Sequence, residues 1–160
     1  MSKVTLDTVI DHLLAALKEG LDGPGKWGFF SDAGPDAGLA ATLKALSASE
    51  ASRVTGGTSI AAHAYHLVFS LGATVAYMNG DRTPQDWAKS WSVVSVTEPT
   101  WKRLQDDLAS AFAETKTAIE TLAKTGFEPA GLAVGAPAHV AYHLGAIRQK
   151  VAFLKAEKRR

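Results

Sequence analysis

The chain has 160 residues, of which 46% are hydrophobic and 21% are charged, and its net charge is +1. This length and composition predict one globular domain, residues 1–160, with enough apolar side chains to form its own core. The low net charge argues against nucleic-acid binding, and no apolar run approaches the ~20 residues of a membrane span. Because the N-terminus also lacks the apolar core of a signal peptide, we expect a cytoplasmic protein without membrane partners.

Cysteine is absent from the chain. Disulfide bonds, thiolate metal ligands and a protein thiol nucleophile are therefore excluded together. A bound metal ion would have to be held by nitrogen and oxygen atoms, and any thiol chemistry would need a thiol supplied by a ligand.

Apolar residues at helical spacing predict four long helices, at 4–19, 58–79, 98–125 and 137–157. Thr58 or Ser59 would cap the second helix, and Pro137 would lie in the first turn of the fourth, after a loop over 127–135. The sequence shows no alternating β pattern and no internal repeat. We therefore predict an all-α fold, a four-helix bundle with a long connection between the second and third helices and one or two short extra helices.

The connections carry weaker signals. Segment 20–35 combines turn residues with Trp27, Phe29 and Phe30, which would either fill one end of the core or line a substrate entrance. A short amphipathic piece follows at 39–46, and Ser47 and Glu50 have the spacing of a capping box.

The long connection contains a further start signal for a short helix. Thr83 and Pro84 would begin this helix, which continues to Trp91. Trp87 and Trp91 are one turn apart and would form one apolar ridge, either in the core or as a lid.

Two of the five histidines, His139 and His143, are four residues apart in the fourth predicted helix. On a helix their side chains point within about 40° of each other, with Cβ atoms roughly 5–6 Å apart. The same face continues into Ile147, so the pair should look into the core. His63 and His66 lie on the second helix. If these helices pack together, three imidazoles and an open position would form a catalytic type of metal site.

Rival metal motifs do not fit. A zincin needs a glutamate directly after the first histidine, but Val140 follows His139. A di-iron carboxylate bundle needs Glu-x-x-His, but Ile60 stands three residues before His63. What remains is a mononuclear, histidine-only site that would accept zinc, nickel or ferrous iron. The alternative is that the imidazoles satisfy one another without a metal. The fifth histidine, His12, is expected on the surface.

Three segments resemble the DinB/YfiT-like family of four-helix-bundle metalloproteins: residues 59–71, the connection around 86–91, and residues 142–149. The resemblance spans roughly 4–155. The family pattern has one histidine before a leucine on the second helix and His-x-x-x-His on the fourth, which implies His66, His139 and His143 as metal ligands. His63 is not required by that pattern. It would be a hydrogen-bond partner of a ligand, a fourth ligand or a substrate contact.

The resemblance implies a thiol S-transferase in which a divalent metal activates a low-molecular-weight thiol, such as bacillithiol, mycothiol or glutathione, to attack a small electrophile. A metal ion lowers the pKa of a bound thiol or water, so a hydrolase using metal-bound water fits the same residues. A non-enzymatic metal-binding or stress-related bundle is the third interpretation. Tyr65, Tyr142 and Arg148 are candidate substrate contacts, although Arg148 equally fits an exposed ion pair. The resemblance also suggests a homodimer.

Overall fold

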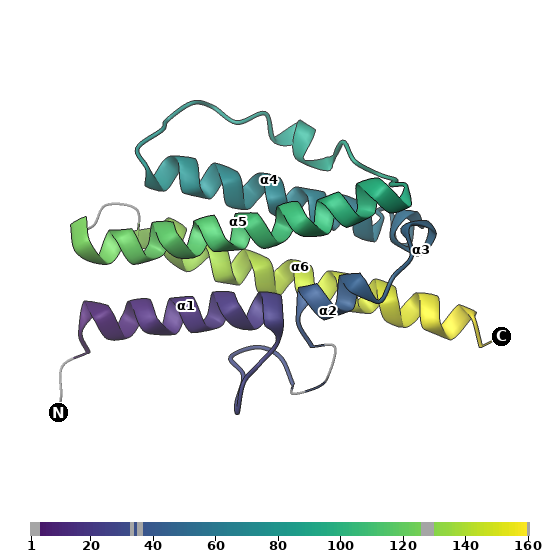
Figure 1. Ribbon diagram of the computed structural model, residues 1–160, viewed down its shortest axis with the longest axis horizontal. Coiled ribbons are helices and arrows are strands. Elements are labelled where there is room, and N and C mark those ends of the chain that lie inside the picture. The colour runs from purple at the N-terminus through teal and green to yellow at the C-terminus, as the bar shows by residue number, and fades with distance from the viewer. Residues whose placement is uncertain (1–3, 33, 35–36, 126–129, 160) are drawn as a thin grey trace.

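The computed structural model describes residues 4–32, 34, 37–125 and 130–159. The regular secondary structure of these residues is helical, apart from one isolated antiparallel bridge between Thr55 and Thr58. The prediction of an all-α fold is therefore confirmed. In chain order the elements are α1 (Leu6–Asp22), α2 (Leu39–Lys44), α3 (Ala48–Ser52), α4 (Ile60–Met78), the 3-10 helix η1 (Trp87–Trp91), α5 (Glu98–Thr125) and α6 (Ala130–Glu157) (Figure 1).

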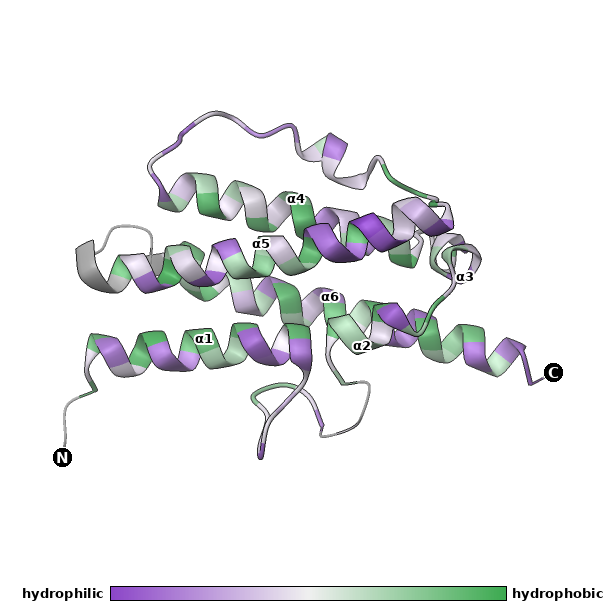
Figure 2. Ribbon diagram, in the orientation of Figure 1, coloured by the Kyte–Doolittle hydropathy of each residue, from purple (hydrophilic) through white to green (hydrophobic). Residues whose placement is uncertain are grey.

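The four long helices pack around one core. Helix α4 contacts α5 and α6, and α1 contacts the same two helices from the other side (Figure 1). Each helix contributes buried apolar residues, among them Leu17, Leu67, Leu108 and Ile147. In Figure 2 hydrophilic and hydrophobic positions alternate along α1 and α5, the pattern of helices with one face in the core.

Helix α1 continues past its predicted end. The Thr5 hydroxyl caps its start by accepting a bond from the Thr8 N–H at 3.2 Å, and Gly23, with φ 88°, follows its last residue. The predicted helix ended at residue 19, directly before Gly20, but this glycine lies buried inside the helix against α6. A Cβ at Gly20 would stand 2.3 Å from Cγ1 of Val140. This glycine therefore permits close packing of α1 on α6.

The loop after α1 is held by a buried carboxylate. Glu19, only 3% exposed, accepts bonds from the N–H groups of Phe29, Phe30 and Ser31 and from the Ser31 hydroxyl. Burial raises the pKa of Glu19, but the bonds from Phe29, Ser31 and Phe30 outweigh it and hold the pKa below its ordinary value. Trp27, Phe29 and Phe30 of this loop remain partly exposed. They therefore do not fill one end of the core, which was the first of the two roles predicted for them. The sequence gives no signal for this role of Glu19.

Helix α6 begins well before its predicted start. Residues 130–135 were expected to belong to a loop but are helical, and Pro137 lies inside the helix. The missing N–H of Pro137 removes the bond to the carbonyl of Ala133, which favours a helix start at this position. Ala133 and Ala136, however, are buried in the core, and this packing keeps the helix continuous through the proline. The rest of the expected loop, residues 127–129, lies outside the described residues.

The connection between α4 and α5 runs along α4 and carries η1 (Figure 1). The predicted helix start at Pro84 was wrong, since η1 begins at Trp87. Asp81 accepts a bond from the Thr83 N–H at 2.8 Å, which holds that segment in a turn. Trp87 packs on Phe69 of α4, with ring centroids 5.6 Å apart. Helix α5 has the predicted bounds.

The short helices α2 and α3 lie where the sequence indicated. Ser47 and Glu50 form the capping box that starts α3, with the Ser47 hydroxyl accepting from the Glu50 N–H and the Glu50 carboxylate accepting from the Ser47 N–H. Lys158 near the end of α6 also binds Glu50, and together with Ser47 it lowers the pKa of Glu50 to about 2. The capping box thus joins α3 to α6.

Candidate metal centre

The histidines lie on the packed faces of α4 and α6. The Ser59 hydroxyl caps α4 by accepting a bond from the Ala62 N–H at 3.0 Å, and it donates to the carbonyl of Val94 at 2.7 Å. The start of α4 and the connection that follows it are therefore joined at this point. On α6, Leu144 and Ile147 continue the histidine face into the core. The imidazoles are held on rigid elements rather than on loops.

Three imidazole nitrogens converge between α4 and α6. The Nε2 atom of His139 lies 2.8 Å from Nε2 of His143 and 3.2 Å from Nε2 of His66. The potential ligand atoms of all three residues lie within 4.8 Å of one another. Two nitrogens bound to one tetrahedral ion at about 2.0–2.1 Å would be roughly 3.3 Å apart. The predicted meeting of these three rings is present, and the group could hold one ion.

The environment keeps these histidines neutral. His143 is 2% exposed, and burial together with the neighbouring His139, His66 and His63 lowers its pKa to about 3. Burial likewise lowers the pKa of His66 and of His139. A neutral imidazole offers a lone pair, which is the form that binds a metal.

Ser90 of η1 fixes the tautomer of His66. The Ser90 hydroxyl, fully buried, donates its proton to the carbonyl of Trp87 at 2.7 Å. The 2.8 Å bond between Ser90 Oγ and His66 Nδ1 must therefore be donated by the imidazole. Since a neutral imidazole carries one N–H, Nε2 of His66 presents a lone pair to the other histidines.

His63 stands behind His143 rather than beside the three converging nitrogens. Its Nδ1 lies 2.8 Å from Nδ1 of His143, and its Nε2 lies 3.0 Å from Oγ1 of Thr58. Burial, then the charge of Lys150, then His66 lower the pKa of His63 to about 4. His63 is therefore a hydrogen-bond partner of His143.

Aromatic side chains flank the cluster. Trp91 stacks on His66 with ring centroids 4.2 Å apart and meets His63 edge-on at 5.3 Å. Tyr142 meets His143 edge-on at 4.9 Å and is 70% exposed. The sequence placed Trp91 in the core or in a lid but did not indicate that it covers a histidine. It also gave no role to Ser90, although this polar residue between two tryptophans lies in the segment that resembles the family.

The remaining candidate residues lie in different places. Tyr65 is partly buried against the core. Arg148 lines a groove between α6, α2 and the loop before α2, and none of the clustered histidines lines that groove. His12 lies on the exposed side of α1, as expected, with Nδ1 2.6 Å from the carbonyl of Thr8.

None of the described helices combines the length and the apolar character that crossing a membrane requires. Comparison with curated proteins gives no match, and comparison with solved structures gives none either. The sequence pattern of the DinB superfamily, however, matches residues 36–147, more than half of the chain and including all of the clustered histidines. The chain therefore belongs to the DinB superfamily.

Proposed function

We propose that His66, His139 and His143 hold one divalent metal ion and that the protein transfers a low-molecular-weight thiol to a small electrophile. The observation that carries the metal assignment is the pair of short contacts between Nε2 atoms. The thiol chemistry is the part of the proposal that rests on the family and on the character of the site.

Protons alone do not satisfy the cluster. Ser90 leaves His66 with a lone pair at Nε2, so the contact with His139 needs a proton on His139 Nε2. If His139 carries that proton, it has no Nε2 lone pair left for a bond from His143. If it does not, the contact with His66 joins two lone pairs. One neutral arrangement can thus give only one of the two contacts an undivided hydrogen bond, whereas a cation would serve all three nitrogens at once.

The surrounding residues would orient the ligands. With Nε2 of His143 on an ion, its proton sits on Nδ1 and is donated to His63, which in turn donates from Nε2 to Thr58. Ser90 and Trp91 hold the ring of His66 in the same way from η1. Such partners behind the ligands fix the tautomer and raise ligand basicity.

The charge balance of the site favours an anionic sulfur nucleophile. Among the described residues, no carboxylate bonds to any of the four imidazoles, so neutral ligands would leave the ion's charge uncompensated. When bound, a divalent ion would lower the pKa of a thiol that reaches it. A thiol starts from a pKa of about 8.5 and water from about 15.7, so the thiol needs no general base from the protein. The thiol would release its proton to water, and the thiolate would form the new S–C bond while the leaving group departs with its electron pair.

Metal content tests the first half of the proposal. The untagged protein is purified and analysed for metals, and we expect one equivalent of zinc, nickel or iron. His143→Ala should lose this metal, whereas His12→Ala, a histidine outside the cluster, should keep it. His63→Ala should still bind one equivalent of metal, but with weaker affinity. A metal-free wild-type protein, or full occupancy in His143→Ala, would contradict the assignment.

Turnover tests the second half. Bacillithiol, mycothiol and glutathione are each offered with a chloronitrobenzene acceptor, and product formation is followed spectroscopically. We expect conjugation with at least one thiol, abolished by a chelator and restored by the metal found in the protein. A protein that binds metal in the His66, His139 and His143 group but conjugates none of these thiols would favour the non-enzymatic bundle instead. Conjugation that is indifferent to chelation would contradict the proposed mechanism.

A further inference from the structure

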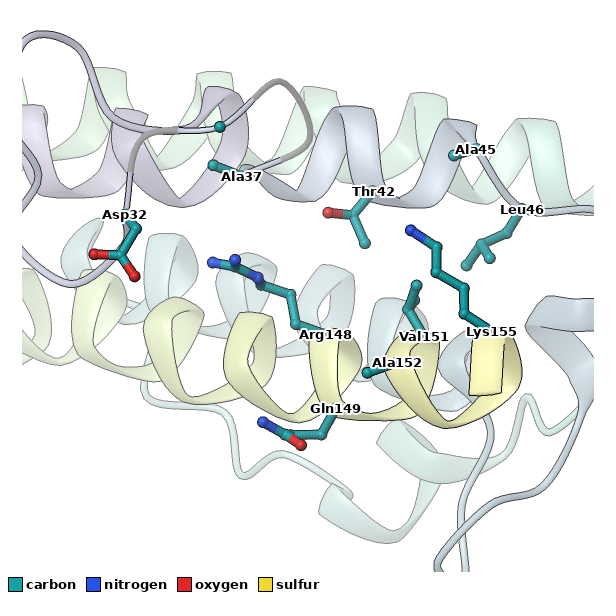
Figure 3. Close-up of a pocket in the computed structure, with 11 residues that line it drawn as sticks. Asp32, Ala37, Thr42, Ala45, Leu46, Arg148, Gln149, Val151, Ala152 and Lys155 are labelled. Atoms are coloured by element: carbon teal, nitrogen blue, oxygen red, sulfur yellow. The ribbon is translucent and has the colours of Figure 1, made fainter. Parts of the chain in front are cut away.

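A groove of about 480 Å³ lies between α6, α2 and the loop before α2 (Figure 3). Its lining includes Asp32, Thr42, Leu46, Arg148, Val151 and Lys155. On α6, Arg148 follows His139 by nine positions, which places the two on opposite sides of the helix. The groove and the histidine cluster are therefore separate features of α6.

Two cations of α6 face into this groove. Arg148 and Lys155 are seven residues apart, so they lie on the same side of the helix and about 10 Å apart along its axis. Figure 3 shows both side chains reaching from α6 toward α2, while Gln149 points away. Within the described part of the chain neither cation forms an ion pair. Lysines of α1 and α5, by contrast, pair with an acidic residue one turn later.

The space between the two cations is mainly apolar. Val151 and Ala152 form its floor on α6, and Leu46 and Ala45 lie across from them. At one end, the carboxylate of Asp32 lies near Arg148 (Figure 3). The groove thus presents a positive group at each end of an apolar strip, with one negative group beside the first cation.

From this arrangement we infer that the groove binds a small linear dicarboxylate, with one acidic group at Arg148, the other at Lys155 and an apolar chain between them. The guanidinium matches a carboxylate with two parallel bonds, and the ammonium supplies a point charge. Asp32 weakens binding of a dianion, so its removal should strengthen it. This inference is independent of the proposed metal site.

Calorimetric titration with azelate tests the inference, because its extended chain separates two carboxylates by about the distance between the cations. We expect saturable binding of azelate by the wild-type protein and no binding of the shorter succinate. Arg148→Gln and Lys155→Gln should each weaken azelate binding about ten-fold, the effect of one lost charge-assisted contact. Asp32→Asn should strengthen it.

Arg103→Gln is the matched control, because Arg103 is an exposed cation on α5 outside the groove. It should bind azelate like the wild type, and added salt should weaken binding by both proteins. Far-ultraviolet circular dichroism checks that each variant is folded. Absence of azelate binding, or equal binding by the wild type and the Arg148→Gln/Lys155→Gln double variant, would overturn the inference.

Discussion

Ser90 determines which nitrogen of His66 faces the other histidines, although it would not touch an ion itself. We expect Ser90→Ala to weaken metal binding about 10–100-fold, the usual effect of removing a partner behind a ligand. Competition with a chromophoric chelator measures this affinity.

Ser110→Ala is the control for this substitution. Its hydroxyl also donates to a backbone carbonyl, that of Asp106, but it lies on the exposed side of α5. We expect this variant to bind metal like the wild type and to unfold at nearly the same denaturant concentration. Wild-type affinity in Ser90→Ala would show that the bond to His66 does not orient the ligand.

The buried histidines make the metal-free protein sensitive to mild acid. The pKa of His63 is lowered to about 4 and that of His143 to about 3, from an ordinary 6.5. Between pH 6.5 and these values the unfolded chain binds protons that the folded chain does not, so stability falls as pH falls. Each histidine contributes up to about 1.4 kcal/mol per pH unit in this window.

Urea unfolding of the chelator-treated protein at about pH 7 and about pH 5 measures this effect. We expect a clear loss of stability at the lower pH and a smaller loss in His143→Gln. The effect of Glu19 is distinguishable from that of the histidines. A lowered carboxylate pKa costs stability only as pH falls below the ordinary value of 4.5. Equal stability at both pH values would contradict the neutral, buried state of the cluster.

At the level of the helices, local sequence signals predicted the bounds of a helix correctly where only local interactions determine them. Helix α5 has its predicted bounds because its apolar repeat and its start signal agree. Helix α6 was predicted too short, because the rule for proline at a helix start ignores the burial of Ala133 and Ala136. Tertiary contacts override this local preference.

The same distinction between local signals and tertiary contacts holds for the histidine cluster. The four-residue spacing of His139 and His143 predicted that these rings share a face, and the family resemblance selected His66. The bonds of His66 to Ser90 and of His63 to His143 join residues 24 and 80 positions apart. Periodicity in a sequence does not report how segments so far apart meet, nor which nitrogen of a ring points inward.

Pro137 inside α6 should lower the free energy of unfolding, and its substitution by alanine tests this. Pro137→Ala restores an N–H to the helix, worth about 3 kcal/mol. It also removes two buried CH₂ groups, each worth about 0.8 kcal/mol. We therefore expect a net gain in the free energy of unfolding of roughly 1–2 kcal/mol, measured by urea denaturation.

Pro99 provides the comparison, because it lies in the first turn of α5, where an N–H has no partner in the helix. Pro99→Ala should leave the stability unchanged or lower it slightly. If Pro137→Ala were destabilised more than Pro99→Ala, the packing of the proline ring would outweigh the missing hydrogen bond.

On the scale of the whole molecule, α6 is contacted by different elements on its different sides. His139 and His143 face α4, Arg148 faces the groove beside α2, and Val140 meets Gly20 of α1. A change at any of these surfaces acts on the helix that carries two of the three proposed ligands.

The approach at Gly20 leaves no room for even one methyl group. Gly20→Ala would force α1 outward or shift the fully buried Val140, which lies directly after His139 in sequence. We expect weaker metal binding and lower thermal stability in Gly20→Ala, and recovery of both in the double variant with Val140→Ala. Helix α1 contributes no residue to the group of His66, His139 and His143, yet we expect its distance from α6 to affect where the imidazoles of that helix lie. A position whose contribution is the absence of a side chain would thus influence the proposed metal centre from the opposite wall of the protein.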